Sequence, residues 1–353
     1  IEMTSIKLSN KIYNNKSLPY IIAEIGVNHN GSLDKAKLLI KSAKEAGADG
    51  VKFQTYKAEK IASKDSPSYW DLNMEPCKNQ YELFKKYDSF TDEDYMACYE
   101  YAKYLNIDFL STPFDAEAVE FLDPLVPFHK IASADITNIP LLRHIAGKSK
   151  PVIISTGAST LEEIELAMFE LSKHGAKEII LLHCILNYPT QFSNANLNMI
   201  NSLQASFPEI HVGISDHTLA DKEMLSMTTA YTMGARVIEK HFTDDKTIKG
   251  GDHLHSMDKE DLLTLKKNIS FVNSLFGSNI KKPLESEGKS RKNARRSIVI
   301  SNNVKKGAKL AEIDLTYKRP ASGISTLYWD DVIGRVTNKD LDFDHILQWN
   351  DLL

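Results

Sequence analysis

The regular alternation of short apolar runs with longer helical segments is the feature that most restricts the fold of this chain. Eight runs rich in aliphatic residues predict buried strands, and each is followed by a segment of helical periodicity. The predicted strands are residues 20–25, 50–54, 107–111, 128–132, 151–155, 178–183, 210–215 and 237–241. Eight strand–helix pairs are the number that closes a (β/α)8 barrel, so the predicted fold class is an α/β TIM barrel.

A doubly wound open sheet is the alternative, but such folds normally open with a glycine-rich phosphate loop, which this sequence lacks. The expected helices include residues 33–46, 91–105, 161–174, 219–233 and 258–276. The connection over residues 56–90 is too long for a simple βα loop, so we expect it to cover the barrel mouth.

The composition changes at Gly277, which predicts a domain boundary. The following stretch is basic, nearly free of apolar residues and without interleaved aromatic rings, which is typical of a solvated linker. We expect residues 297–300, 315–318 and 332–336 to form strands of a small β-rich module, with a turn at 305–307. The predicted domains are the barrel over 1–277 (with an N-terminal extension over 1–16), the linker over 278–296 and the β-rich module over 297–353.

The net charge of −4 gives no electrostatic basis for nucleic acid or an anionic membrane as partner. No apolar run approaches the roughly 20 residues of a membrane span. The three cysteines, Cys77, Cys98 and Cys184, have no metal-binding or redox spacing, and so sparse and odd a number predicts a cytoplasmic protein.

Polar side chains lie at or near the carboxyl end of all eight predicted strands. The active sites of (β/α)8 barrels lie at the carboxyl ends of the strands, so these side chains are candidate site residues. They are Glu24, Lys52, Gln54, Thr112, Lys130, Ser133, Asp135, Ser155, Tyr188, Ser215, His217, Glu239 and His241.

Two lysines, Lys52 and Lys130, lie inside otherwise apolar strands. One interpretation is a pair of buried ion pairs, with Glu24 or Asp135 as partner. The other is that both lysines hold a small anion such as a phosphorylated acid, with serine hydroxyls from Ser133, Ser155 and Ser215 donating to it.

Two histidines, His217 and His241, end neighbouring strands and could share one cation. The alternative is two hydrogen-bonded histidines without a metal. A site without cysteine suits Mn²⁺, Co²⁺ or a similar divalent ion with open positions. Asp252 either completes the ligand set or binds a substrate hydroxyl, whereas His253 and His255 are expected to be polar loop residues.

These residues predict a metal-assisted, aldol-like step on a phosphorylated acid, in which Glu239 or Glu24 moves a proton. A metal-dependent barrel hydrolase is an alternative, although hydrolases of that kind commonly carry a His-x-His pair on the first strand, where this chain has Asn28-His29-Asn30. A non-catalytic carbohydrate-binding protein is another alternative.

The same motifs resemble those of the sialic acid (nonulosonate) synthase family, collinearly from about residue 20 to the end of the chain. The matching runs include Ala23-Glu24-Ile25-Gly26, Lys52-Phe53-Gln54-Thr55, Ser111-Thr112-Pro113-Phe114, Lys130-Ile131-Ala132-Ser133, Ser215-Asp216-His217 and Glu239-Lys240-His241. The tail, with Lys318-Arg319-Pro320, resembles the antifreeze-like (SAF) domain of the family.

The resemblance implies condensation of phosphoenolpyruvate with an N-acetylmannosamine-type sugar, giving a nine-carbon 2-keto acid and phosphate. It implies that His217 and His241 ligate a divalent metal, Mn²⁺ before Mg²⁺ or Co²⁺, that Glu239 handles protons, and that Glu24 and Asp252 bind sugar hydroxyls. The residues implied to hold phosphoenolpyruvate are Lys52, Gln54, Thr112, Lys130, Ser133, Ser155 and Ser215. Asp135 and Tyr188 complete the predicted substrate-binding set.

The resemblance further implies a homodimer with a swapped C-terminal domain, in which Arg319 reaches the partner's sugar. Legionaminate or pseudaminate synthesis from a 2,4-diacetamido-trideoxyhexose is the alternative within the family. The chain departs from the family at Ile185-Leu186-Asn187, where small polar residues are usual, so one polar contact to phosphate is in doubt.

Overall fold

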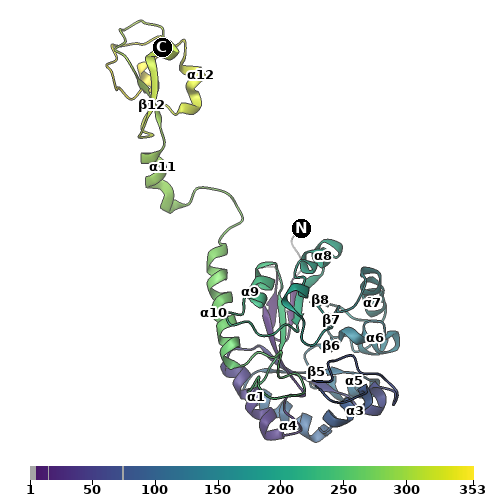
Figure 1. Cartoon of the computed structure of the whole chain (residues 1–353). Coiled ribbons are helices and arrows are strands. Elements are labelled where there is room, and N and C mark those ends of the chain that lie inside the picture. Colours follow the sequence, from purple (N-terminus) through teal and green to yellow (C-terminus); the bar gives the residue numbers. More distant parts are fainter. Residues whose placement is uncertain (1–4, 15, 74) are drawn as a thin grey trace. The chain divides into compact units, whose positions relative to one another are not determined.

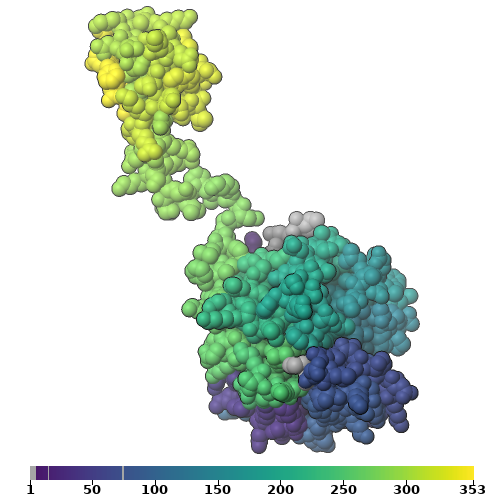
Figure 2. Space-filling view, viewed as in Figure 1, coloured from purple at the N-terminus to yellow at the C-terminus, as the bar shows by residue number. Residues whose placement is uncertain are grey.

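The computed structural model describes residues 5–14, 16–73 and 75–353. The chain divides into two compact units, with the boundary between Phe276 and Gly277 (Figures 1 and 2). Residues 1–4 and 15 of the expected N-terminal extension lie outside the described residues.

The larger unit is a barrel of parallel strands, and the predicted (β/α)8 fold is confirmed. Hydrogen-bonded neighbours follow the order β5-β4-β3-β10-β9-β8-β7-β6, and β5 and β6 at the two ends of this order lie side by side. The strands are β3 (Tyr20–Gly26), β4 (Gly50–Thr55), β5 (Asp108–Pro113), β6 (His129–Ile131), β7 (Val152–Ser155), β8 (Ile179–Cys184), β9 (His211–Asp216) and β10 (Val237–His241).

Helices surround the barrel and bury an apolar stripe against it (Figure 1). In α7, Ile164, Ala167 and Leu171 form this stripe, and a capping box of Thr160 and Glu163 starts the helix. The helices that follow the strands are α1 (Leu33–Glu45), α4 (Asp92–Tyr104), α5 (Ala116–Leu122), α6 (Ile139–Ala146), α7 (Leu161–Lys173), α8 (Met199–Ser206), α9 (Leu225–Thr232) and α10 (Lys259–Phe276). None of the described helices has the length and apolar character of a membrane span.

The expected helix over 219–233 begins later than predicted, at Leu225. The carboxylate of Asp221 accepts hydrogen bonds from the backbone N–H groups of Leu225 (2.7 Å) and Ser226 (3.2 Å), as a capping residue does. Met224 has a left-handed backbone (φ 51°), which prevents the helix from extending towards residue 219.

An antiparallel hairpin that the sequence analysis did not predict precedes the barrel. It consists of β1 (Ile6–Leu8) and β2 (Lys11–Tyr13). Its buried Tyr13 makes an edge contact with Tyr20, the first residue of β3, and Tyr20 makes another with Phe128 just before β6. The hairpin therefore packs at the amino ends of the strands and leaves the carboxyl ends for the site.

The long connection over residues 56–90 contains two short helices, α2 (Ala58–Ile61) and α3 (Gln80–Tyr87). Short 3₁₀ helices occur at η1 (Ser133–Asp135), η2 (Phe192–Asn194), η3 (Glu285–Glu287), η4 (Glu312–Asp314), η5 (Thr326–Tyr328) and η6 (Trp349–Asp351).

The smaller unit has its own apolar core, which includes Ile298, Ile300 and Leu347. Two of its predicted strands are present as β11 (Ser297–Ile300) and β12 (Leu315–Lys318), and they pair antiparallel. The third expected strand, 332–336, is wrong, because Val332 ends α12 (Trp329–Val332) and Gly334 turns the chain with φ 87°. Residues 277–296 are exposed and contain the unpredicted helix α11 (Gly288–Ala294).

Candidate active site

Four charged side chains meet inside the barrel. The ammonium of Lys52 lies 2.9 Å from Glu24 Oε2 and 3.8 Å from Glu239 Oε2, and the ammonium of Lys130 lies 3.6 Å from Glu239 Oε1. All four side chains are buried. Their strands β3, β4, β6 and β10 are not all neighbours in the ladder, so these contacts cross the barrel interior.

Both interpretations of the lysines describe part of this cluster. Lys52 pairs with Glu24 as the ion-pair interpretation predicts, but Lys130 pairs with Glu239 and not with Asp135. The lysines nevertheless converge on one space at the carboxyl ends of the strands, as an anion site requires.

Hydroxyl groups surround the two ammonium groups. Lys52 donates to Thr112 Oγ1 (2.8 Å) and Lys130 donates to Ser155 Oγ (2.8 Å). Ser215 donates to Glu239 Oε1 (2.9 Å). A hydroxyl that accepts from lysine keeps its own proton, so Thr112 and Ser155 retain an O–H that can donate to an anion.

Two further predicted residues lie at the edge of this cluster. Gln54 donates to Glu24 Oε1 (3.1 Å), and the hydroxyl of Ser133 accepts from the backbone N–H of Gly157 (2.9 Å). Asp135 follows Ser133 in η1 and is half-buried, and its carboxylate accepts a hydrogen bond from Asn138 (3.0 Å). The structure thus gathers the predicted anion-binding residues, but no contact joins Asp135 to the charge cluster among the described residues.

The two glutamates differ in pKa. Burial raises the pKa of Glu24 to about 7, with the charge of Glu239 adding to the effect and Lys52 opposing it. Burial also acts on Glu239, but the nearby Lys130 and Lys52 outweigh it and hold the pKa of Glu239 below its usual value. Glu239 is therefore ionised at neutral pH, while Glu24 is close to half-protonated.

The lysines differ in the same way. Burial lowers the pKa of Lys52, but the carboxylates of Glu239 and Glu24 outweigh burial and leave this pKa raised. For Lys130 burial prevails, and the pKa falls below its usual value. The neighbouring carboxylates therefore outweigh burial at Lys52 but not at Lys130.

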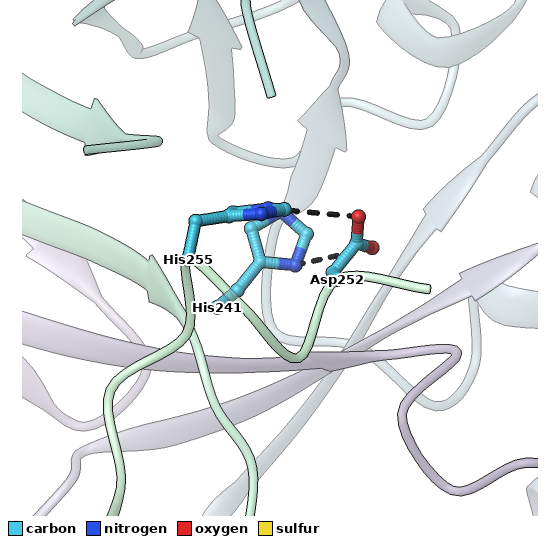
Figure 3. Close-up of side chains that lie close together, drawn as sticks. All are labelled: His241, Asp252 and His255. Carbon is cyan, nitrogen blue, oxygen red and sulfur yellow. Dashed lines mark ion pairs between the residues drawn. The ribbon is translucent and has the colours of Figure 1, made fainter. Parts of the chain in front are cut away.

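Next to the charge cluster, His241, Asp252 and His255 converge (Figure 3). His241 Nδ1 lies 3.3 Å from one carboxylate oxygen of Asp252, and His255 Nε2 lies 3.5 Å from the other. One ligand atom from each of the three residues lies within 4.8 Å of the others. Sequence analysis missed His255, which is 3% exposed and not the polar loop residue expected.

These three residues fit a divalent cation. His241 Nδ1 and His255 Nε2 are buried, and among the described residues neither has a hydrogen-bond partner, although each faces an oxygen of Asp252. Burial lowers the pKa of both histidines well below the usual value, so their nitrogen lone pairs are available. Burial raises the pKa of Asp252 to about 6. Two nitrogen donors and a carboxylate, without sulfur, suit a cation that keeps open coordination positions.

His217, the other predicted metal ligand, adjoins this group. Its ring centroid lies 5.4 Å from that of His241 and 6.0 Å from that of His255. Its Nδ1 is hydrogen-bonded to the carbonyl of Ile185 (2.8 Å) and contacts Cys184 Sγ at 3.7 Å. Tyr188 packs on the ring of His217 at 4.2 Å, so this predicted residue also belongs to the site.

The loop that carries Asp252 is fixed by two parts of the barrel unit. The backbone N–H of Asp252 donates to Asn28 Oδ1 (3.2 Å). From the connection 56–90, Glu75 lies so close to Gly250 that an added Cβ would stand 3.1 Å from Glu75 Oε2. That connection therefore lies beside the loop that carries Asp252, and that it covers the barrel mouth stays a prediction. Arg319 lies in the smaller unit and is exposed.

The raised pKa of Glu24 predicts a pH dependence of stability. Between its usual pKa of 4.5 and about 7, the folded barrel binds more protons than the unfolded chain, so its free energy of unfolding falls as the pH rises. Glu24→Gln has no proton to lose, so we expect wild type to lose stability relative to E24Q between pH 5 and 8 in denaturant titrations. Changing the exposed Glu260 to Gln is the control, and parallel curves for wild type and E24Q would contradict the assignment.

Comparison with known proteins agrees with this geometry. The NeuB family model matches residues 39–281 and the SAF domain model matches 295–353. N,N'-diacetyllegionaminic acid synthases of Legionella pneumophila and Campylobacter jejuni are 40% and 41% identical, covering 94% and 93% of this chain and 93% and 98% of theirs. The crystal structure of an N-acetylneuraminic acid (sialic acid) synthetase from Leptospira borgpetersenii, in complex with citrate, superposes with a TM-score of 0.72 at 32% identity, covering 82% of this chain and 95% of that one. The chain is therefore a member of the NeuB family, with a barrel followed by a SAF domain.

Proposed function

We propose that this protein condenses phosphoenolpyruvate with an N-acetylated mannose-type sugar, giving a nine-carbon 2-keto acid and phosphate. The observation that carries the proposal is the buried Lys52–Lys130 pair, lined by hydroxyl groups and adjoined by the His241–Asp252–His255 group. An anion site beside a cation site at one barrel mouth suits a phosphorylated acid that attacks a carbonyl.

As acceptor we propose 2,4-diacetamido-2,4,6-trideoxymannose, which makes the product N,N'-diacetyllegionaminic acid. Support comes from the higher identity to the legionaminic acid synthases than to the sialic acid synthetase of known structure. N-acetylmannosamine, with N-acetylneuraminate as product, is the second candidate.

The anion would bind between the two lysines. Phosphoenolpyruvate carries a phosphate and a carboxylate, and both can pair with the ammonium groups of Lys52 and Lys130, which also contact the two glutamates. Thr112 and Ser155 supply hydroxyl donors, whereas the hydroxyl of Ser215 donates to Glu239. Burial of these groups excludes water and strengthens each charge-assisted hydrogen bond.

His241, Asp252 and His255 would hold the divalent cation, with His217 as the adjacent fourth group. We propose Mn²⁺, since His241, Asp252 and His255 offer nitrogen and oxygen donors. When bound, the cation would polarise the aldehyde of the acceptor sugar.

Glu24 is better suited to proton transfer than Glu239. A group whose pKa lies near the working pH can both take and give a proton, and the pKa of Glu24 is about 7. Two lysines keep Glu239 as a carboxylate. Lys52 contacts both Glu239 and Glu24, so a change in the charge of one glutamate affects the other. We propose that the two glutamates act together, with Glu24 as the group that exchanges the proton.

All three cysteines are free. Unpaired cysteines are usual in the reducing cytoplasm, where we propose that the reaction takes place.

The activity can be tested by phosphate release from phosphoenolpyruvate with Mn²⁺. We expect EDTA-sensitive release, with the highest kcat/KM for the mannose-configured 2,4-diacetamido sugar over N-acetylmannosamine and the altrose-configured sugar. Lys130→Met, which removes one ammonium from the anion site, is expected to lower kcat/KM for phosphoenolpyruvate by at least about 100-fold. No release with any of the three sugars, from protein that binds Mn²⁺, would contradict the proposal.

The metal site can be tested by Mn²⁺ titration in electron paramagnetic resonance. Removing a ligand leaves fewer donors, so His241→Ala, His255→Ala and His217→Ala should each weaken Mn²⁺ binding by at least about tenfold. The half-buried His174 pairs with Glu170, and His174→Ala is the control. Unchanged binding in H255A would remove His255 from the ligand set, and unchanged binding in H217A would do the same for His217.

We also propose the swapped homodimer, with Arg319 reaching the sugar in the partner's barrel. Support comes from Arg319 being exposed and, among the described residues, without a carboxylate partner. Coexpression of Arg319→Ala with His241→Ala tests this, because only a swapped heterodimer combines an intact barrel with an intact tail. We expect about a quarter of wild-type activity from random pairing. Activity no higher than that of the separate variants would contradict the swap.

A further inference from the structure

We propose that the buried ion pair between Lys240 and Asp216 is a positioning device for His217 and His241. This inference rests on the proposed function, because it assigns the pair a role in holding the cation site of the condensation. The two residues lie within the motifs that carry the histidines, but neither of them reaches the charge cluster or the His241–Asp252–His255 group.

Strand geometry separates the two kinds of residue. Side chains alternate between the faces of a strand, and β9 and β10 pair with Glu239 opposite Ser215 and Lys240 opposite Asp216. Glu239 and Ser215 bond to each other inside the barrel. Lys240 and Asp216 therefore face the other side, towards the helices, one residue away from His241 and His217.

The pair holds the backbone on both sides of His217. The ammonium of Lys240 donates to Asp216 Oδ2 (2.5 Å) and to the carbonyl of Thr218 (2.6 Å). The carboxylate of Asp216 accepts from the Thr218 hydroxyl (2.8 Å) and, at 3.3 Å, from its backbone N–H. One side chain from β10 thereby fixes residues 216 and 218, between which His217 lies.

The neighbouring backbone continues this support. The N–H of Thr190 donates to the carbonyl of His217 (2.8 Å), and the N–H of Met257 donates to the carbonyl of His241 (2.8 Å). The Lys240–Asp216 ion pair connects the carboxyl end of β10 to that of β9. A change in either strand end would move one histidine relative to the other.

Stability alone does not account for this pair. Lys240 is fully buried and Asp216 is 5% exposed, so both charges lose their hydration. A fully buried ion pair is often matched or exceeded in stability by apolar side chains of similar volume. Its neighbours on this face, Ile214 and Ile238, are themselves apolar and buried. Fixing one geometry at the strand ends is the role that a directional pair fills and an apolar pair does not.

The test replaces the pair by apolar side chains in the full-length protein. Lys240→Met with Asp216→Leu avoids the unpaired buried charge that either single change would leave. We expect the double variant to melt near the wild-type temperature but to bind Mn²⁺, measured by electron paramagnetic resonance, about tenfold or more weakly. We expect kcat at saturating Mn²⁺ to recover while the apparent KM for Mn²⁺ rises. Lys240→Arg, which keeps a cation opposite Asp216, should retain most of the affinity.

The matched control is Arg143→Met with Glu170→Leu, which removes a 2.7 Å ion pair between α6 and α7 and should leave Mn²⁺ binding unchanged. Wild-type Mn²⁺ affinity in the folded K240M/D216L variant would overturn the inference. If that variant does not fold, Thr218→Val decides, because it removes only the hydroxyl bond to Asp216: weaker Mn²⁺ binding supports the inference and unchanged binding overturns it. A wild-type protein that binds Mn²⁺ but releases no phosphate would overturn the proposed function and not this result.

Discussion

The four-membered charge cluster inside the barrel is the constraint on which the rest of the site depends. Two ammonium groups and two carboxylates lie within 4 Å of a partner inside the barrel, where they are buried among hydroxyl groups of neighbouring strands. Charges in such a space are stable only when balanced, and the carboxylates of Glu24 and Glu239 balance the two ammonium groups. The same contacts give the two glutamates different pKa values. Glu239 contacts both lysines, which hold its pKa below the usual value, whereas Glu24 pairs with one lysine and burial raises its pKa to about 7. The proposed anion binding and the proposed proton transfer therefore involve the same four charged groups.

Side chains alternate between the two faces of β9 and β10, so the residues of the charge cluster and the Lys240–Asp216 ion pair lie on opposite faces. Inward positions carry Ser215 and Glu239, while the outward positions between them and the histidines carry Asp216 and Lys240. A parallel strand that is buried on both faces normally has apolar residues at both. Ser215 and Glu239 on the inner face belong to the proposed reaction site. Asp216 and Lys240 on the outer face hold the two strand ends at a fixed separation. In this part of the barrel mouth, His217 and His241 are placed by strand ends, whereas Asp252 and His255 are placed by the loop that follows β10.

Sequence alone predicted most of what depends on local pattern. The eight strands and the residues at their carboxyl ends could be found because apolar runs are local and because the barrel rule converts position along a strand into position in space. Features that depend on a single backbone conformation or on distant packing could not be predicted. The start of α9 is set by Met224 and Asp221. Gly334 turns the chain where a strand was expected over residues 332–336. His255 was missed for the same reason, since a loop histidine three residues after Asp252 becomes a candidate ligand only when the loop folds back over His241.

The chain departs from the family at Ile185-Leu186-Asn187, but this departure does not affect how His217 is held. What matters there is the backbone of the segment and not the side chain of Ile185. The contact that Ile185 makes with the site is through its carbonyl, which accepts from His217 Nδ1. Any residue at this position supplies that carbonyl, so loss of a polar side chain leaves the orientation of His217 intact. Thr190 continues the pattern, since its hydroxyl donates to the carbonyl of Asn187 while its N–H donates to the carbonyl of His217. The segment 185–190 therefore holds His217 by two main-chain contacts, from Ile185 and Thr190, and by the ring of Tyr188, and none of these depends on the side chains of residues 185–187.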